Sequence, residues 1–229
     1  MARRSRRAEV PPMWTSVLAV IAHPDDASFG LGAILDAFIF AGARVEVLCL
    51  TYAQAWALTE APGDLAMLRG AEVASAADVL VQFRVKMQDR PDGALGEMCQ
   101  TKLASEVVAT ADSCHPDGLL VFDAPAVPGH LEHISAASVG LRAAETLDLP
   151  VLGWTLSEMV AERLSVQFAL SFTGAQDDQI DLRVTVDRAR RRLASRANVD
   201  RSLPGSPARR RMQLLADTQS LRWLRAEAI

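Results

Sequence analysis

Short apolar runs alternate with longer, helix-like segments through most of this 229-residue chain. Residues 17–22 form the clearest run, because they are continuously apolar and lead directly into polar residues. A run of this kind is typical of a strand that is buried on both faces, as in a parallel sheet. The other predicted strands are 43–51, 83–87, 118–123 and 151–156.

Helical spacing of apolar residues fills the intervals between these strands. The predicted helices are 31–41, 64–80, 101–112 and 130–147. Regular alternation of strand and helix, with right-handed crossovers, leads to a parallel sheet that is covered on both faces. We therefore expect an α/β fold with a Rossmann-like, doubly wound and mostly parallel sheet and helices on both faces.

The pattern changes after residue 156. Residues 181–186 alternate like a strand, and two Arg-rich helices are predicted near 187–198 and 207–227. Residues 157–180 carry no clear pattern and are a candidate for a loop that closes over a substrate. We expect residues 1–13 to form a disordered basic tail and residues 14–229 to form a single domain.

Composition narrows the range of partners. A net charge of −4 argues against general nucleic-acid binding, and the local Arg clusters are interpreted as solvated helix faces. The three cysteines form no CxxC pair, which favours a reducing cytoplasm. No apolar run is long enough for a signal peptide core or a membrane span. The sequence leaves the oligomeric state open, a homo-oligomer included.

Two polar clusters each follow a predicted strand. AHPDDASFG at 22–30 follows the strand at 17–22, and GHLEH at 129–133 follows the strand at 118–123. Ligands of open α/β sheets bind at the carboxyl ends of the strands. If these two strands are neighbours, the two clusters face each other across one crevice.

Two histidines and a carboxylate are a common catalytic zinc set, with a fourth position for water or substrate. His23 can be one ligand, and either Asp25 or Asp26 can bind the metal while the other takes a proton from water. Of His130 and His133, the one that does not bind metal can stabilise an oxyanion. The alternative is purely structural, with a strand-end histidine and an Asp that caps the following helix.

At these residues the chain resembles the LmbE-like (PIG-L) family of N-acetylglucosaminyl deacetylases. The resemblance extends over roughly residues 15–200 and includes further segments in the usual order of the family. These are LCLT at 48–51, Arg69 with Glu72, PDG at 91–93, LLVFD at 119–123, LGWTL at 152–156 and VDRARRRLAS at 186–195.

The resemblance implies a role for each matching residue. His23, Asp26 and His133 correspond to the zinc ligands, one ion per chain. Asp25 corresponds to the general base, and His130 corresponds to the histidine that stabilises the tetrahedral intermediate.

Arg69 and Asp92 match positions that are expected to contact the sugar or its appended group. Their structural alternatives are an Arg69–Glu72 pair on a helix face and a turn aspartate in PDG.

Some positions depart from the family pattern. Ala27 stands where a Glu is common, HLEH replaces the usual His-Pro-Asp-His, and Tyr52 to Trp56 replace a Gly-Glu element. Asn198 lies near a position that often carries His. These departures suggest that the metal centre is retained and that the substrate pocket is altered.

The predicted function is zinc-dependent removal of an N-acetyl group from an N-acetylglucosamine-type conjugate, a small-molecule acylated amino sugar. The alternatives are a zinc amidase for another acyl-amide, a non-catalytic sugar-binding module, or a Rossmann-like domain without a metal. His115-Pro116-Asp117 imitates the first motif but precedes a strand, so we interpret it as a loop.

Overall fold

A computed structural model describes residues 11–24, 26–51, 83–91, 93–126, 131–185, 207–215 and 218–226. The predicted helices at 64–80 and 187–198, and most of the predicted tail, lie outside these residues. Within them, Met13 is almost fully exposed whereas Trp14 is buried. The hydrophobic core thus begins at Trp14.

The described residues form a seven-stranded sheet in the order β3-β2-β1-β4-β5-β7-β6. The strands from β3 to β5 pair in parallel, whereas β7 pairs antiparallel with both β5 and β6. The sheet is therefore mostly parallel, as predicted, with an antiparallel extension at one edge. The strands are β1 (Ser16–Ile21), β2 (Arg44–Cys49), β3 (Phe83–Met87), β4 (Gly118–Phe122), β5 (Val151–Thr155), β6 (Leu182–Thr185) and β7 (Thr218–Arg225).

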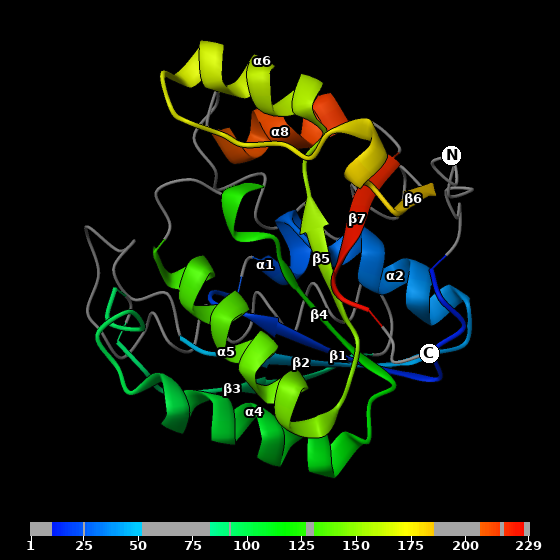
Figure 1. Cartoon of the computed structure of the whole chain (residues 1–229), viewed down its shortest axis with the longest axis vertical. Coiled ribbons are helices and arrows are strands. Elements are labelled where there is room, and N and C mark those ends of the chain that lie inside the picture. Colours follow the sequence, from blue (N-terminus) through cyan, green and yellow to red (C-terminus); the bar gives the residue numbers. More distant parts are fainter. Residues whose placement is uncertain are drawn as a thin grey trace.

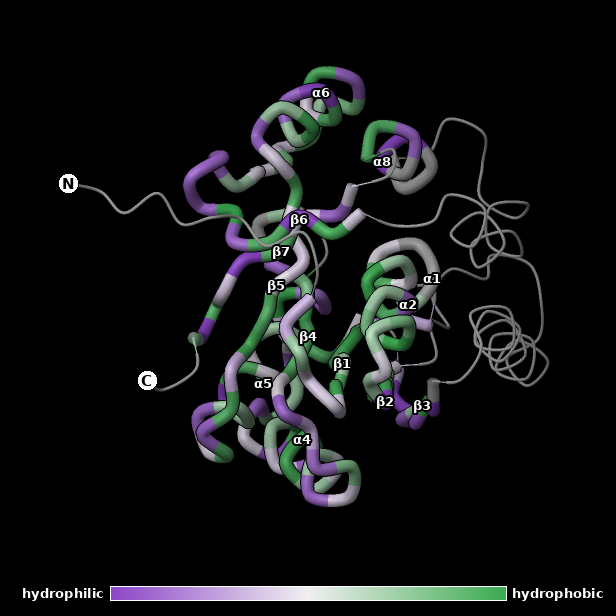
Figure 2. The backbone as a smooth tube through the Cα atoms, turned by 90° about the vertical axis from the view of Figure 1, so that its right-hand side faces the viewer, coloured by the Kyte–Doolittle hydropathy of each residue, from purple (hydrophilic) through white to green (hydrophobic). Residues whose placement is uncertain are grey.

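Helices cover both faces of this sheet. On one face α4 and α5 pack side by side, while α2 covers the other face and α6 packs with α8 near β5 and β7 (Figures 1 and 2). None of the described helices combines the length and the hydropathy that a membrane crossing requires. The α-helices are α1 (Asp26–Phe29), α2 (Gly32–Phe40), α4 (Gln100–Cys114), α5 (Leu131–Leu147), α6 (Glu158–Phe168) and α8 (Pro207–Leu215).

The alternation of β1 side chains explains this arrangement. Val17, Ala19 and Ile21 belong to the core cluster on the α2 face, and Leu18 and Val20 belong to the cluster on the α4–α5 face. Every residue of β1 is buried. Because both faces exclude water, the sequence of such a strand is continuously apolar rather than alternating.

The segment after β5 is a helix, contrary to the prediction of a loop. α6 occupies Glu158–Phe168 and buries Val160, Ala161 and Leu164. These positions lie on one face of the helix and the polar residues between them are exposed, which is the pattern of an amphipathic surface helix. The isolated bridge between Ser157 and Ala175 then returns the chain to the sheet.

The predicted helix at 207–227 is wrong over its second half. α8 ends at Leu215, and Thr218–Arg225 form β7. Gln219, Ser220 and Leu221 are buried between β5 and β6. Pairing with two strands satisfies the β7 backbone on both sides, and this tertiary effect overrides a sequence that is compatible with a helix.

The second His-Pro-Asp string is structural, in agreement with its interpretation as a loop. His115 ends α4 in the left-handed conformation, with φ of 48°. The Asp117 carboxylate accepts hydrogen bonds from Thr15 Oγ1 at 2.9 Å and Ser16 N at 3.1 Å, and from Thr15 N. Asp117 thus anchors the start of β1.

We expect the substitution Gly118→Ala to destabilise the chain. A Cβ atom at Gly118 would lie 2.4 Å from the Trp14 ring, which is itself stacked on Phe38 and edge-on to Trp223. Overpacking of this kind costs about 1–3 kcal/mol. Urea unfolding measures the decrease in the free energy of unfolding. Gly96→Ala is the control, because its Cβ would meet only Ser135 Oγ at 3.8 Å. Equal stabilities for the two variants would contradict this packing.

Candidate metal centre

The parallel pairing of β1 with β4 brings the two motifs together. Val17 to Ala19 align with Gly118 to Leu120, so the carboxyl ends of these neighbouring strands lie at the same edge of the sheet. His23 follows β1, and Asp26 begins α1. His133 lies in the first turn of α5, which follows β4. The two strands are neighbours, so the condition under which the two motifs face each other is met.

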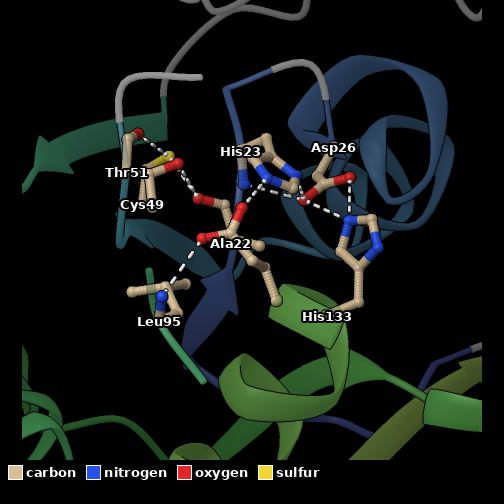
Figure 3. A network of polar contacts seen from close by, with 8 residues as sticks. Ala22, His23, Asp26, Cys49, Thr51, Leu95 and His133 are labelled. Atoms are coloured by element: carbon tan, nitrogen blue, oxygen red, sulfur yellow. Dashed lines mark hydrogen bonds and ion pairs between the residues drawn. The ribbon is translucent and has the colours of Figure 1, made fainter. Parts of the chain in front are cut away.

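His23, Asp26 and His133 form one compact cluster (Figure 3). His133 Nε2 lies 2.8 Å from Asp26 Oδ1 and 2.9 Å from Oδ2. His23 Nδ1 lies 3.8 Å from Asp26 Oδ2, and the His23 backbone N–H donates to that oxygen at 2.9 Å. The two imidazole rings meet edge to face, with centroids 5.1 Å apart.

The chemistry of this donor set fits a divalent transition metal. One ligand atom from each residue lies within 4.8 Å of the other two. Two ligands of a common zinc ion, each about 2.1 Å from it, are at most about 4.2 Å apart, so only small side-chain adjustments are needed. Asp26 and His133 are buried, and His23 is partly buried. Zinc, iron(II) and cobalt all accept two imidazoles and a carboxylate.

The charge on Asp26 suits a metal ligand. Burial alone would raise the pKa of this carboxyl, but the charges and hydrogen bonds of His133 and then His23 outweigh burial and lower the pKa from 3.8 to about 2. In the metal-free chain, this carboxylate stabilises the fold above pH 3.8, and the stabilisation is lost as the pH falls through about 2. Asp26 is therefore anionic at neutral pH.

Glu132 is a site residue that sequence reasoning missed. Its Oε2 lies 2.6 Å from His23 Nε2, and its Oε1 accepts a hydrogen bond from the Leu95 backbone N–H at 3.3 Å. Glu132 is buried. In the sequence it stands out only as part of the departure from the family motif, although a carboxylate adjacent to a candidate ligand histidine is a signal that could have identified it.

Hydrogen bonds from β2 hold the backbone that precedes His23. The carbonyl oxygen of Ala22 accepts from Thr51 N at 3.0 Å and from Thr51 Oγ1 at 2.9 Å. Cys49 Sγ also donates to this oxygen, at 3.6 Å. Figure 3 shows Thr51 and Cys49 next to Ala22, beside the cluster. The strand end that carries His23 is therefore tied to the neighbouring strand by both backbone and side chains.

Aromatic side chains pack next to His133. The Phe122 ring lies 5.1 Å from the His133 ring and 5.4 Å from Trp154, measured between centroids. A Cβ atom at Gly30 would lie 2.2 Å from Phe122 Cζ, so a larger residue at this position would displace the Phe122 ring. Ala27, one of the departures from the family pattern, is fully buried in the core of the same face.

Asp123 is a second carboxylate at this sheet edge, but it has a structural partner. Arg222 of β7 meets it with Nε at 2.8 Å from Oδ2 and with Nη2 at 2.8 Å from Oδ1. Nη2 donates a charge-assisted hydrogen bond to Oδ1, and the proximity of Nε to Oδ2 adds to the ion pair. The pair attaches the antiparallel extension of the sheet to the end of β4.

The remaining predicted site residues lie outside the described residues. These are Asp25, His130, Arg69 and Asp92. Their predicted roles stay predictions, as does the altered segment from Tyr52 to Trp56. The structure thus brings together the three predicted metal ligands and adds Glu132 to them.

Comparison with known proteins identifies the family. The family model of PIG-L, described as GlcNAc-PI de-N-acetylase, matches residues 18–144, which is more than half of the chain. A comparison with curated proteins finds no significant match.

Solved structures share the fold at low sequence identity. The N,N'-diacetylchitobiose deacetylase from Pyrococcus horikoshii is 15% identical, with 93% of this chain and 84% of that chain covered at a TM-score of 0.63. The zinc-inhibited form of teicoplanin deacetylase is 17% identical, with 94% of this chain and 100% of that chain covered at a TM-score of 0.63. A 4-carboxy-2-hydroxymuconate hydratase from Pseudomonas putida is 14% identical, with 94% of this chain and 98% of that chain covered at a TM-score of 0.63.

The hydratase shows that this fold also supports other chemistry, so the fold alone does not name the reaction. The family match provides the assignment, because it covers both polar motifs and the three clustered ligand residues. The chain belongs to the PIG-L family of de-N-acetylases and is a metal-dependent N-deacetylase.

Proposed function

We propose that this N-deacetylase uses zinc to remove the acetyl group from an N-acetylglucosamine-type conjugate. The observation that carries the proposal is the cluster of His23, Asp26 and His133 at the carboxyl edge of the sheet in a PIG-L family member. The family description and the diacetylchitobiose deacetylase both concern acetylated amino sugars. An acylated amino sugar is therefore the favoured substrate class.

The reaction converts an amide and water into a carboxylate and a free amine. When bound, zinc supplies Lewis acidity that acidifies water and polarises the amide carbonyl. Asp25 is the proposed general base that accepts the proton of the attacking water. His130, as imidazolium, is proposed to stabilise the developing oxyanion and to protonate the leaving amine. Asp26 and the two ligand histidines hold the metal in place.

A deacylase for another acyl-amide is the second candidate. The motivation is the altered segment from Tyr52 to Trp56, where the family usually has a Gly-Glu element. Arg69 and Asp92 are proposed to contact the sugar or its appended group in either case. A panel of substrates with different acyl chain lengths on one amino-sugar scaffold separates the two candidates. For an enzyme that is specific for the acetyl group, kcat/KM falls as the acyl chain of the substrate lengthens.

Metal removal is the first test. We expect the purified chain to contain about one zinc ion per chain, to lose acetate release after chelation and to regain it on addition of one equivalent of zinc. Excess zinc, iron(II) and cobalt are assayed separately, since a structural relative has a zinc-inhibited form. Full activity in chelated, metal-free protein would refute the proposal.

The same substitution at the adjacent residues Asp25 and Asp26 tests which of them is the general base and which is the metal ligand. Asp25→Asn is expected to keep the metal and to lower kcat by about 10²–10⁴-fold, as for loss of a general base. Asp26→Asn is expected to lose metal as well as activity, because a charged ligand is removed. Metal analysis and acetate release are measured on both variants. The assignment fails if Asp25→Asn loses the metal or if Asp26→Asn retains it.

Substrate contacts are tested separately from the chemistry. Arg69→Ala and Asp92→Ala are expected to raise KM for the amino-sugar substrate more than they lower kcat, because contacts remote from the amide add mainly uniform binding energy. Steady-state kinetics on the intact conjugate and on free N-acetylglucosamine measure the difference. An unchanged KM with both substrates would favour the structural interpretation of these two residues.

A further inference from the structure

We propose that Glu132 is a positioning residue that selects which nitrogen of His23 binds the metal and links this ligand to the segment after Gly93. The inference rests on the proposed metal centre. Both carboxylate oxygens have a partner from a different part of the chain: His23 Nε2 at 2.6 Å and Leu95 N at 3.3 Å. The contacts of His23 and Leu95 can be followed in Figure 3.

The geometry assigns the two nitrogens of His23 different roles. A histidine binds a metal as a neutral imidazole, in which one nitrogen donates and the other accepts. A carboxylate can only accept, so the short contact with Glu132 places the ring proton on Nε2. The lone pair is then on Nδ1, which lies on the Asp26 side, 3.8 Å from Oδ2. His23 therefore offers Nδ1 to the metal, whereas His133 directs Nε2 towards Asp26.

The position of Glu132 on α5 suits an anion. It is an acidic residue in the first turn of the helix, where the helix dipole favours negative charge. The next residue, His133, is itself a predicted metal ligand. The first turn of α5 thus supplies His133, a predicted ligand, and Glu132, the group that orients His23 on the opposite side of the cluster.

Leu95 gives the carboxylate a rigid second anchor. The Leu95 side chain is fully buried in the core cluster on the sheet face that α4 and α5 cover. Its carbonyl oxygen accepts a hydrogen bond from Gln100 Nε2 at 2.8 Å, so both sides of this residue are held. The segment begins at Gly93, whose φ of 87° marks a turn next to the predicted substrate residue Asp92. Glu132 therefore connects that turn to His23.

The substitution Glu132→Gln tests the assignment with little change in shape. The glutamine oxygen can still accept from Leu95 N, but its amide group would donate to His23 Nε2. The ring proton then moves to Nδ1, where it blocks metal binding unless the contact is broken. Loss of such outer partners typically weakens metal affinity by about 10–100-fold. Glu132→Asp keeps the charge with a shorter reach and is expected to recover part of the affinity.

The experiment titrates metal-free protein with zinc against a competing chelator. Glu145→Gln is the matched control, since it makes the same change of charge at an exposed position of α5. The expected result is a zinc Kd that rises about 10–100-fold in Glu132→Gln and is unchanged in Glu145→Gln, with equal unfolding midpoints of the metal-free proteins. An unchanged Kd in Glu132→Gln would overturn the proposal.

A second measurement keeps the proposal testable if Glu132→Gln does not fold. Long-range ¹H–¹⁵N correlation spectra of the metal-free wild type, recorded at a pH at which the His23 ring is neutral, report which nitrogen of His23 carries the proton. A proton on Nε2 is expected, and a proton on Nδ1 would overturn the proposal. This readout also separates two failures: a wild type that binds no divalent metal contradicts the proposed function, while the tautomer still tests the role of Glu132.

Discussion

The buried carboxylate of Asp26 is the constraint on which the site depends. An anion removed from water is costly unless opposite charge and hydrogen bonds compensate for it. The imidazole of His133 lies within hydrogen-bond distance of both Asp26 oxygens, and the His23 backbone N–H donates to one of them. These partners lower the pKa of Asp26 despite its burial. A divalent cation at the same place would satisfy this carboxylate more completely, and for that reason we interpret the cluster as a metal centre.

The fold holds this cluster by connecting each ligand to a rigid element. His23 follows a strand end whose carbonyl, Ala22 O, is bound by Thr51. Asp26 begins α1, and Gly30, which directly follows this helix, leaves no space for a Cβ atom beside the Phe122 ring. His133 lies in the first turn of α5. Ligands on strand ends and helix starts are held more precisely than ligands on long loops.

The fold and the reaction are separate conclusions in this protein. Structures with this fold include deacetylases and a hydratase, all at TM-scores of 0.63. Their sequence identities of 14–17% are too low to transfer a reaction. The de-N-acetylase assignment comes from the family match over residues 18–144, and the metal-ligand cluster shows that the two motifs in that match form one site.

The sequence alone predicted the parallel part of the sheet and the convergence of His23, Asp26 and His133. Strands such as β1 and β4 are buried on both faces, so their sequences are local apolar runs. The first polar motif follows β1 directly, and the second follows β4 after a short connection. Three-dimensional pairing was required for β7, because its strand conformation depends on β5 and β6 rather than on its own residues. The same applies to Glu132, whose partner His23 lies 109 residues away in the chain. Local patterns encode burial and the start of a helix, whereas a hydrogen bond between distant residues exists only after the sheet has aligned them.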